Sequence, residues 1–131
     1  MVSDKKKILM IEDDSFIVKM YRTKFEDLGF IFRDAGTGDK GMELARGERP
    51  DLIILDIVLP QKDGFQILKE IKKDSQLSGI PVLMLSNLGQ EEEVEKGLAL
   101  GAEDYLIKAH FTPSEVVERV KKMFQKDGKP I

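Results

Sequence analysis

Cysteine is absent from the sequence, and histidine occurs only once, at His110. Without cysteine the chain has no disulfide framework, no thiolate metal site and no cysteine nucleophile. A single histidine excludes a metal centre with several histidine ligands, and we expect His110 to be a solvated loop residue. Any metal site in this chain is therefore built from oxygen ligands.

Long hydrophobic runs and a large excess of one charge are also missing. Apolar runs such as residues 52–55 and 82–85 are far too short to span a bilayer. The charged segment from Met1 to Lys7 leads into only a brief apolar run, unlike a signal peptide. The net charge of -3 gives no electrostatic reason to expect nucleic acid or an acidic membrane as a partner. We therefore expect a cytoplasmic protein that binds neither.

The length of 131 residues fits one domain and leaves little room for a second. Hydrophobic residues make up 41% and charged residues 34%, a balance typical of a globular domain. We expect a single domain over residues 1–131, with its core at about residues 6–126.

Short apolar runs alternate five times with stretches of helical periodicity. The runs are residues 8–11, 31–35, 52–55, 82–85 and 105–107. Two of them are almost continuously aliphatic, which is typical of strands buried on both faces of a sheet. The alternation predicts βαβ units with right-handed crossovers, and hence an α/β fold with a parallel sheet covered by helices on both faces.

The helical stretches carry apolar stripes and start signals. Thr112, Pro113 and Glu115 predict a capping box with proline at the first helical position, and Asp63 can cap the third helix. Gly97 predicts a loosened fourth helix. The first helix has a broad stripe that ends before Gly29 and consists of Phe16, Val18, Met20, Tyr21, Phe25 and Leu28.

Polar residues follow four of the five predicted strands. In a doubly wound sheet, ligands bind beyond the carboxyl ends of the strands. The groups expected there are Glu12, Asp13 and Asp14 after the first strand, Asp56 after the third, Ser86 and Asn87 after the fourth, and Lys108 after the fifth. These carboxylates, one hydroxyl and one ammonium are predicted to converge on one edge of the sheet.

Packed carboxylates repel one another unless a cation lies among them, and an oxygen-only site favours Mg²⁺. An aspartate such as Asp56 can act as a nucleophile and form an acyl phosphate, while Lys108 and Ser86 contact the phosphoryl oxygens. Each residue also has a simpler interpretation: Asp13 or Asp14 can cap the first helix, and Lys108 can be a solvated charge. The complete set at four strand ends favours a phosphorylation site.

The motifs that carry this set resemble the receiver domain of two-component response regulators. Residues 8–14 are similar to the family's first strand and acidic pair, residues 55–64 to its phosphoacceptor strand and the following loop. Residues 83–86 are similar to the strand that ends in serine or threonine, and residues 101–108 to the last strand with its aromatic residue and lysine. The resemblance covers almost the whole chain and implies a doubly wound, five-stranded (βα)5 sandwich with strand order 2-1-3-4-5.

The resemblance implies that Asp56 accepts a phosphoryl group from a phosphohistidine of a sensor histidine kinase or a phosphotransfer protein. Ser86 and Lys108 would then contact the phosphoryl oxygens. The implied Mg²⁺ ligands are Glu12, Asp13, Asp56 and the backbone carbonyl of Val58. Such a domain is not a conventional enzyme, because it catalyses only its own phosphorylation and slow dephosphorylation.

The resemblance also implies a switch at Tyr105. Its ring would turn between outward and inward positions as Ser86 moves, and so change the surface of helix four, strand five and helix five. A downstream protein or an output domain would bind this surface, and a dimer formed there on phosphorylation stays open. No output domain is expected after residues 126–131, so the chain is either a stand-alone regulator or part of a longer protein.

Two positions, Ala109 and Asn87, depart from the family pattern, and Val58 and Leu88 lie at sites where family members vary. Ala109 replaces the usual proline after the lysine, and a cis bond without proline costs about 2.5–4 kcal/mol. This predicts a loop that is trans and differently aimed, or strained, from which Lys108 can still reach the site. Asn87 replaces a very small residue and is expected to narrow access to Asp56 or to bond near the phosphate. Val58 and Leu88 are apolar and cannot position an attacking water, which predicts a long-lived phosphoaspartate.

Two other classes of protein compete with this interpretation. A receiver-like scaffold that is never phosphorylated would keep the fold alone. A phosphatase with an aspartate nucleophile typically needs a second aspartate two residues later, where this chain has Val58. A nucleotide-binding enzyme is disfavoured because no glycine-rich loop follows the first strand.

Overall fold

The computed structural model describes residues 5–126 of the chain. Residues 1–4 of the charged N-terminal segment and residues 127–131, where no output domain is expected to follow, lie outside the described residues. Within residues 5–126, one parallel sheet has the order β2-β1-β3-β4-β5. Its strands are β1 (Lys7–Ile11), β2 (Ile31–Ala35), β3 (Leu52–Leu55), β4 (Val82–Ser86) and β5 (Asp104–Ile107).

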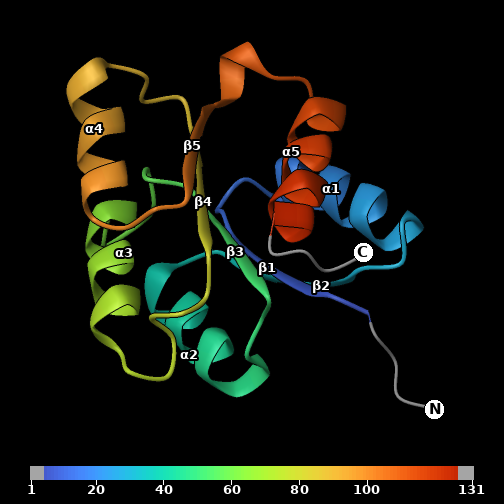
Figure 1. Ribbon diagram of the computed structural model, residues 1–131, viewed down its shortest axis with the longest axis horizontal. Helices are drawn as coiled ribbons and strands as arrows, with labels where there is room; N and C mark the ends of the chain where they lie inside the picture. The colour runs from blue at the N-terminus through green and yellow to red at the C-terminus, as the bar shows by residue number, and fades with distance from the viewer. Residues whose placement is uncertain (1–4, 127–131) are drawn as a thin grey trace.

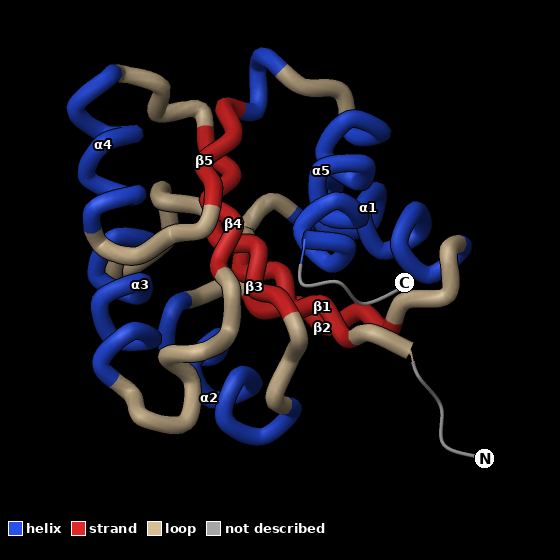
Figure 2. Tube along the Cα trace, viewed as in Figure 1, coloured by secondary structure: helices blue, strands red, loops and turns tan. Residues whose placement is uncertain are grey.

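Helices cover both faces of the sheet and complete a three-layer sandwich (Figure 1). One layer contains α1 and α5, and the other contains α2, α3 and α4, as the secondary-structure colouring makes plain (Figure 2). The helices are α1 (Ser15–Asp27), α2 (Gly38–Glu48), α3 (Gly64–Lys73), α4 (Glu91–Ala99) and α5 (Pro113–Lys126), with a 3-10 helix, η1 (Lys108–His110), after β5. The predicted fold class and strand order are confirmed.

The core consists of two apolar layers, one on each face of the sheet. Alternate residues of β1 divide between them: Ile8 and Met10 pack with α1 and α5, whereas Leu9 and Ile11 pack with α2 and α3. All four residues of β3 are buried, as expected for a central strand between two helical layers. Truncating such a buried aliphatic side chain to alanine typically costs about 2–5 kcal/mol.

Side-chain caps fix where the helices begin. The Asp14 carboxylate accepts hydrogen bonds from the backbone N–H groups of the first turn of α1, at 2.9 and 3.3 Å. The Asp63 carboxylate does the same for α3. At α5, Thr112 and Glu115 exchange bonds of 2.8 and 3.2 Å, which confirms the predicted capping box.

The predicted apolar stripe of α1 is too broad. Val18, Tyr21 and Phe25 are buried against the sheet and α5. In contrast, Phe16 is 84% exposed, and Met20 and Leu28 are also exposed. The sheet and α5 cover a narrower arc of the helix than the apolar residues occupy, so periodicity alone overestimates the buried face.

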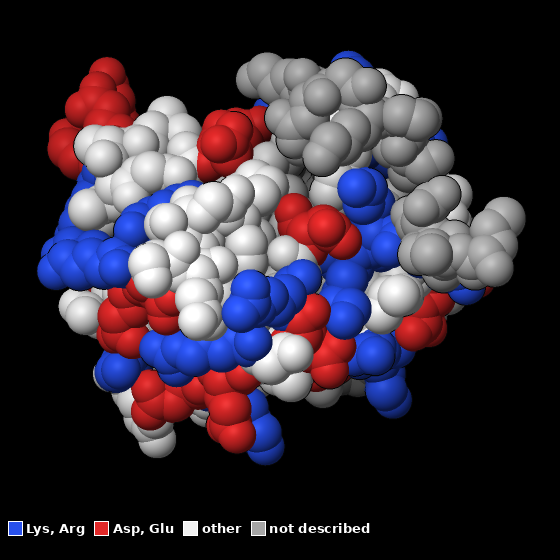
Figure 3. All heavy atoms as spheres, turned by 60° about the horizontal axis from the view of Figure 1, so that its bottom comes forward, with Lys and Arg blue, Asp and Glu red and all other residues white. Residues whose placement is uncertain are grey.

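Basic and acidic side chains are interspersed on the face that Figure 3 brings forward. Several ion pairs join different elements, such as Lys7 to Glu48 at 2.9 Å and Arg46 to Asp74 at 3.3 Å. Among residues 5–126, every helix is too short or too polar to cross a membrane.

Candidate functional site

The carboxyl ends of β1, β3 and β5 bring three predicted site residues into contact. The Lys108 ammonium lies 2.6 Å from Glu12 Oε1 and 3.0 Å from Asp56 Oδ2. Glu12 follows β1 directly, Asp56 follows β3 and Lys108 follows β5. Residues separated by up to 96 positions in the sequence therefore meet at one edge of the sheet. This meeting is expected because the carboxyl ends of parallel strands lie at the same edge.

The Asp56 side chain is buried and held by its own loop. Its Oδ1 accepts the N–H of Ile57 at 2.7 Å and that of Val58 at 3.4 Å, while Oδ2 faces Lys108. The Asp56 N–H donates to the Ile11 carbonyl at 3.1 Å, which ties the loop to the end of β1. With 6% of its surface exposed, Asp56 lies in a fixed orientation but is still reached from one side.

Burial and charge oppose each other at Glu12 and Lys108. Burial raises the pKa of Glu12, against the lowering effect of its hydrogen bonds from Lys108 and the Asp14 N–H. Burial acts to lower the pKa of Lys108, but the bond to Glu12 and the charge of Asp56 outweigh it, so the pKa is raised. Lys108 is therefore a firmly protonated ammonium between two carboxylates.

The acidic residues include a group that fits a hard metal ion. Glu12, Asp13 and Asp56 each offer a carboxylate oxygen, and these oxygens all lie within 4.8 Å of one another. Asp13 is exposed, whereas Asp14 is engaged as the cap of α1, which leaves Asp13 free to act as a ligand. Three carboxylates with no nitrogen or sulfur ligand among them match the donor chemistry that Mg²⁺ prefers.

Ser86 is the last residue of β4 and is fully buried. Its Oγ accepts the Leu88 N–H at 3.4 Å. Asn87 is exposed and lines a shallow cavity with Leu88 and the start of α4. Asn87 is therefore placed at the surface of this loop, and its expected bond near a phosphate stays a prediction.

Tyr105 is buried, with 8% of its surface exposed. Its hydroxyl donates to the Leu88 carbonyl across 17 positions of sequence. The structure thus holds the predicted switch residue in its inward position.

Ala109 does not prevent Lys108 from reaching the acidic residues. Peptide bonds within residues 5–126 are all trans, including the one between Lys108 and Ala109. The chain turns here through η1, and Phe111 N–H donates to the Lys108 carbonyl at 3.4 Å. His110 is exposed in this short helix, in agreement with its interpretation as a solvated residue.

The supporting roles of two residues near the site, Gly64 and Lys62, were not predicted from the sequence. A Cβ atom at Gly64 would lie only 2.2 Å from the Asp56 carbonyl oxygen, so the start of α3 can approach the loop this closely only at a glycine. The Lys62 ammonium binds Asp39 at 3.1 Å and Glu70 at 3.2 Å, and so fastens the same loop to α2 and α3. No local pattern reveals either contact, because both depend on tertiary neighbours.

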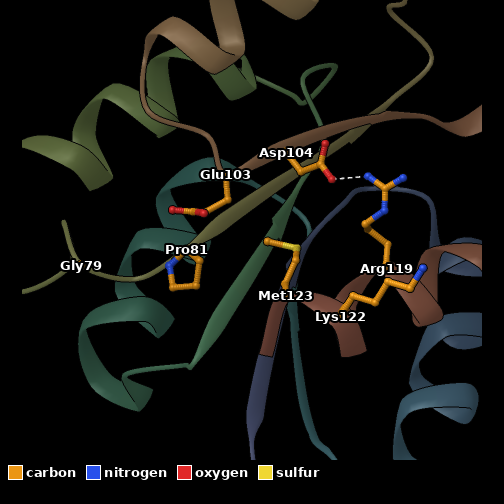
Figure 4. Close-up of a pocket in the computed structure, with 7 residues that line it drawn as sticks. All are labelled: Gly79, Pro81, Glu103, Asp104, Arg119, Lys122 and Met123. Atoms are coloured by element: carbon orange, nitrogen blue, oxygen red, sulfur yellow. Dashed lines mark hydrogen bonds and ion pairs between the residues drawn. The ribbon is translucent and has the colours of Figure 1, made fainter. Parts of the chain in front are cut away.

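A cavity beside the first residue of β5 is not part of this site. It lies beside α5, and Asp104 forms an ion pair with Arg119 at its rim (Figure 4). Its lining residues are Gly79, Pro81, Glu103, Asp104, Arg119, Lys122 and Met123. Because Asp104 begins β5 and Lys108 follows its end, this cavity lies at the opposite end of the strand from Asp56.

Comparison with known families decides the identity of this arrangement. The model of the response regulator receiver domain matches residues 8–121. The chain belongs to this family. Receiver domains are the phosphoacceptor modules of two-component response regulators, and the strand order and strand-end residues described above agree with that assignment.

Similar proteins extend the comparison. The probable transcriptional regulator ycf27 of Guillardia theta is 35% identical over 125 residues, which are 95% of this chain and 48% of that protein. The DNA-binding dual master transcriptional regulator RpaA of Synechocystis is 38% identical over 120 residues, 92% of this chain and 49% of that protein. This receiver domain thus spans about half the length of these curated relatives.

A solved structure shows the same fold. The receiver domain of the Francisella response regulator 1452 is 32% identical and superposes with a TM-score of 0.85. The match covers 94% of this chain and 99% of that one.

Proposed function

We propose that Asp56 of this receiver domain accepts a phosphoryl group from the phosphohistidine of a sensor histidine kinase or a phosphotransfer protein. The observation that carries the proposal is the Lys108 ammonium, 3.0 Å from Asp56 Oδ2 beside a cluster of three carboxylates. Membership of the response regulator receiver family supports the same assignment.

In the proposed transfer, an Asp56 carboxylate oxygen forms a bond to phosphorus while the bond from phosphorus to the donor nitrogen breaks. The histidine leaves with the electron pair of that bond. The N–H groups of Ile57 and Val58 orient the Asp56 carboxylate before the reaction. Because this orientation exists before the donor arrives, little reorganisation is needed at the acceptor.

The residues around Asp56 have separate roles in the proposal. Mg²⁺ bound by Glu12, Asp13, Asp56 and the Val58 carbonyl would offset the negative charge of the phosphoryl oxygens. Lys108 would exchange its bonds to the two carboxylates for a bond to a phosphoryl oxygen. Ser86 would donate its hydroxyl proton to another, since within residues 5–126 its Oγ is seen only as the acceptor of the Leu88 N–H.

Movement of Ser86 is proposed to reach the surface through Leu88 and Tyr105, which are joined by a hydrogen bond. The partner at that surface is either an output domain of the same polypeptide or a separate protein. We propose that the domain signals by contact with another protein in the cytoplasm. The net charge of -3 and the interspersed charges in Figure 3 support a protein partner, because they give no electrostatic reason to expect nucleic acid or an acidic membrane. The single domain is proposed to extend over residues 1–131, with its core at about residues 6–126.

Intact mass measurement tests the phosphorylation proposal. The protein is incubated with Mg²⁺ and acetyl phosphate, and the expected result is a mass gain equal to one phosphoryl group. The gain should disappear in Asp56→Asn and on chelation of Mg²⁺. Asp51→Asn is the matched control, because Asp51 is an exposed aspartate at the other end of β3 and should not affect the gain.

Retention of the full mass gain in Asp56→Asn would show that the phosphoryl group is carried elsewhere. No gain in the unchanged protein, under conditions where a known receiver domain is phosphorylated, would leave only the role of a binding scaffold.

A further inference from the structure

The ring of Tyr105 packs against the backbone of α4 at Gly97. A Cβ atom built on Gly97 would lie 2.9 Å from Tyr105 Cδ2 and 3.3 Å from Cε2. Carbon atoms in contact are normally about 3.5–4.0 Å apart, so no other residue fits here unless the ring moves. Gly97 is buried although it belongs to a helix with charged neighbours on its outer side.

Tyr105 and position 97 also share a buried neighbour on β4. Met84 Cγ, on the adjacent strand β4, would lie 3.7 Å from the same Cβ atom, which is already ordinary van der Waals contact. Met84 pairs with Tyr105 across the sheet and belongs to the same buried layer. Because this layer is buried and close-packed, we expect a larger residue at position 97 to displace Tyr105 toward solvent rather than inward.

The position of Tyr105 is linked to the phosphorylation site by two hydrogen bonds. Its hydroxyl donates to the Leu88 carbonyl, and the Leu88 N–H donates to Ser86 Oγ at 3.4 Å. Leu88 thus joins the buried tyrosine to the serine at the end of β4. If the ring leaves its place under α4, the hydroxyl can no longer reach Leu88.

We propose that Gly97 is a positioning residue of this receiver domain: the absence of a side chain there admits the Tyr105 ring beneath α4 and thereby permits the link from Ser86 through Leu88 to α4. Glycine is a poor helix residue compared with alanine, and its presence in α4 is explained by the space that the ring needs. The sequence alone indicates only a loosened helix at this position.

The test observes Tyr105 directly. The sequence contains two tyrosines and no tryptophan, so Tyr21→Phe leaves Tyr105 as the sole fluorophore. In that background Gly97→Ala is compared with Gly47→Ala. Gly47 also lies in a helix, but a Cβ atom there meets nothing within 4 Å, so the control makes the same chemical change without a collision.

Two measurements report the position of the ring. Burial raises the pKa of Tyr105 to about 12, with the charges of Glu93 and Asp56 acting in the same direction. In Gly97→Ala the absorbance titration of the phenol should move from about 12 toward the ordinary value of about 10. Quenching of its fluorescence by acrylamide should approach that of N-acetyltyrosinamide, whereas Gly47→Ala should behave as the background does.

An unchanged titration and unchanged quenching in folded Gly97→Ala would overturn the proposal. If this variant does not fold, adding Tyr105→Leu decides the matter, because a smaller side chain relieves the collision. Recovery of folding in the double variant supports the proposal, and failure to recover contradicts it.

The role in signalling rests on the proposed phosphorylation of Asp56, and the two are tested separately. Tyr105 exposure is measured without any phosphodonor, so it does not depend on whether Asp56 reacts. With acetyl phosphate and Mg²⁺, Gly97→Ala should gain the phosphoryl mass as the background does but should lose the change in Tyr105 fluorescence on phosphorylation. A mass gain with an unaltered fluorescence response would refute the positioning role alone.

Discussion

The ammonium of Lys108 lies closer to Glu12 than to the proposed phosphoacceptor: 2.6 Å from Glu12 Oε1, against 3.0 Å from Asp56 Oδ2. Both carboxylates are buried, so each contact with the cation is strong. Lys108 therefore neutralises part of the charge that a metal ion would neutralise, and it must give up Glu12 or Asp56 when a phosphoryl group arrives.

Lys108→Gln should slow phosphorylation without weakening Mg²⁺ binding. A lost charge-assisted hydrogen bond to the phosphoryl group corresponds to a rate lower by about 10- to 100-fold. Mg²⁺ affinity should stay equal or rise, because the carboxylates lose a competing cation. The rate is followed by intact mass with acetyl phosphate, and the affinity by calorimetry. Lys40→Gln, at an exposed lysine of α2, should alter neither.

The adjacent Asp13 and Asp14 should have opposite roles. Asp14→Ala removes the cap of α1 and should lower the free energy of unfolding by about 1 kcal/mol, with little change in Mg²⁺ affinity. Asp13→Ala should weaken Mg²⁺ binding by at least about tenfold, the loss typical even of outer-shell partners, and leave stability unchanged. Urea unfolding and calorimetry on both variants give the comparison. Similar effects of the two substitutions would contradict the division.

This pair shows where sequence reasoning ends. The strands were predicted to within a residue at their ends because runs such as Leu52–Leu55 are aliphatic throughout and buried on both faces. Glu12, Asp56 and Lys108 do follow the ends of β1, β3 and β5, as expected, while their chemical roles stay predictions. The sequence could not show whether Asp13 or Asp14 caps α1. The two residues are chemically identical, and only the backbone conformation at the start of the helix decides which side chain reaches its first N–H groups.

Contacts between elements that are distant in the sequence could not be predicted either. The closeness of Gly64 to Asp56 and of Gly97 to Tyr105 depends on how helices lie on the sheet, which no local pattern encodes. Phe16 belongs to the apolar stripe predicted from helical periodicity but is exposed, because periodicity does not define how wide an arc of α1 is covered.

Gln61 adopts a positive φ of 70° in the loop that follows Asp56. This left-handed conformation costs most residues about 1–2 kcal/mol, and glycine avoids that cost. Gln61→Gly should raise the free energy of unfolding by about 0.5–1 kcal/mol, since the greater freedom of glycine in the unfolded chain offsets part of the gain. Gln66→Gly, inside α3, should lower it by about 1 kcal/mol. Urea unfolding measures both, and a loss of stability in Gln61→Gly would show that the loop is not strained.

Tyr21 should make the domain sensitive to alkaline pH. Burial, with the nearby charge of Glu12, raises the pKa of Tyr21 to about 12 from 10.0. A raised pKa means that the folded state holds the proton more tightly, so this stabilisation is complete below pH 10 and is lost as pH rises toward 12. It amounts to about 3 kcal/mol. Unfolding free energies between pH 8 and pH 11.5 should fall less steeply in Tyr21→Phe, and parallel profiles would contradict the assignment.

The lifetime of the phosphoaspartate should be set by Val58. Its side chain is 61% exposed two residues after Asp56, whereas Leu88 packs partly into the core. An apolar group at this position neither orients nor deprotonates an attacking water, so we expect hydrolysis over minutes to hours rather than seconds. Val58→Asn introduces an amide that can hold the water, and should shorten the lifetime by about tenfold. This factor is smaller than the rate acceleration of about 10²–10⁴ that a well-placed acid or base gives.

The lifetime is measured as decay of the phosphorylated mass after acetyl phosphate is removed. Leu98→Asn is the matched control, because Leu98 is an exposed apolar residue on α4 and cannot influence water at Asp56 through a local contact. Its decay should equal that of the unchanged protein. Decay within seconds in the unchanged protein would mean that another group near Asp56 already positions the water.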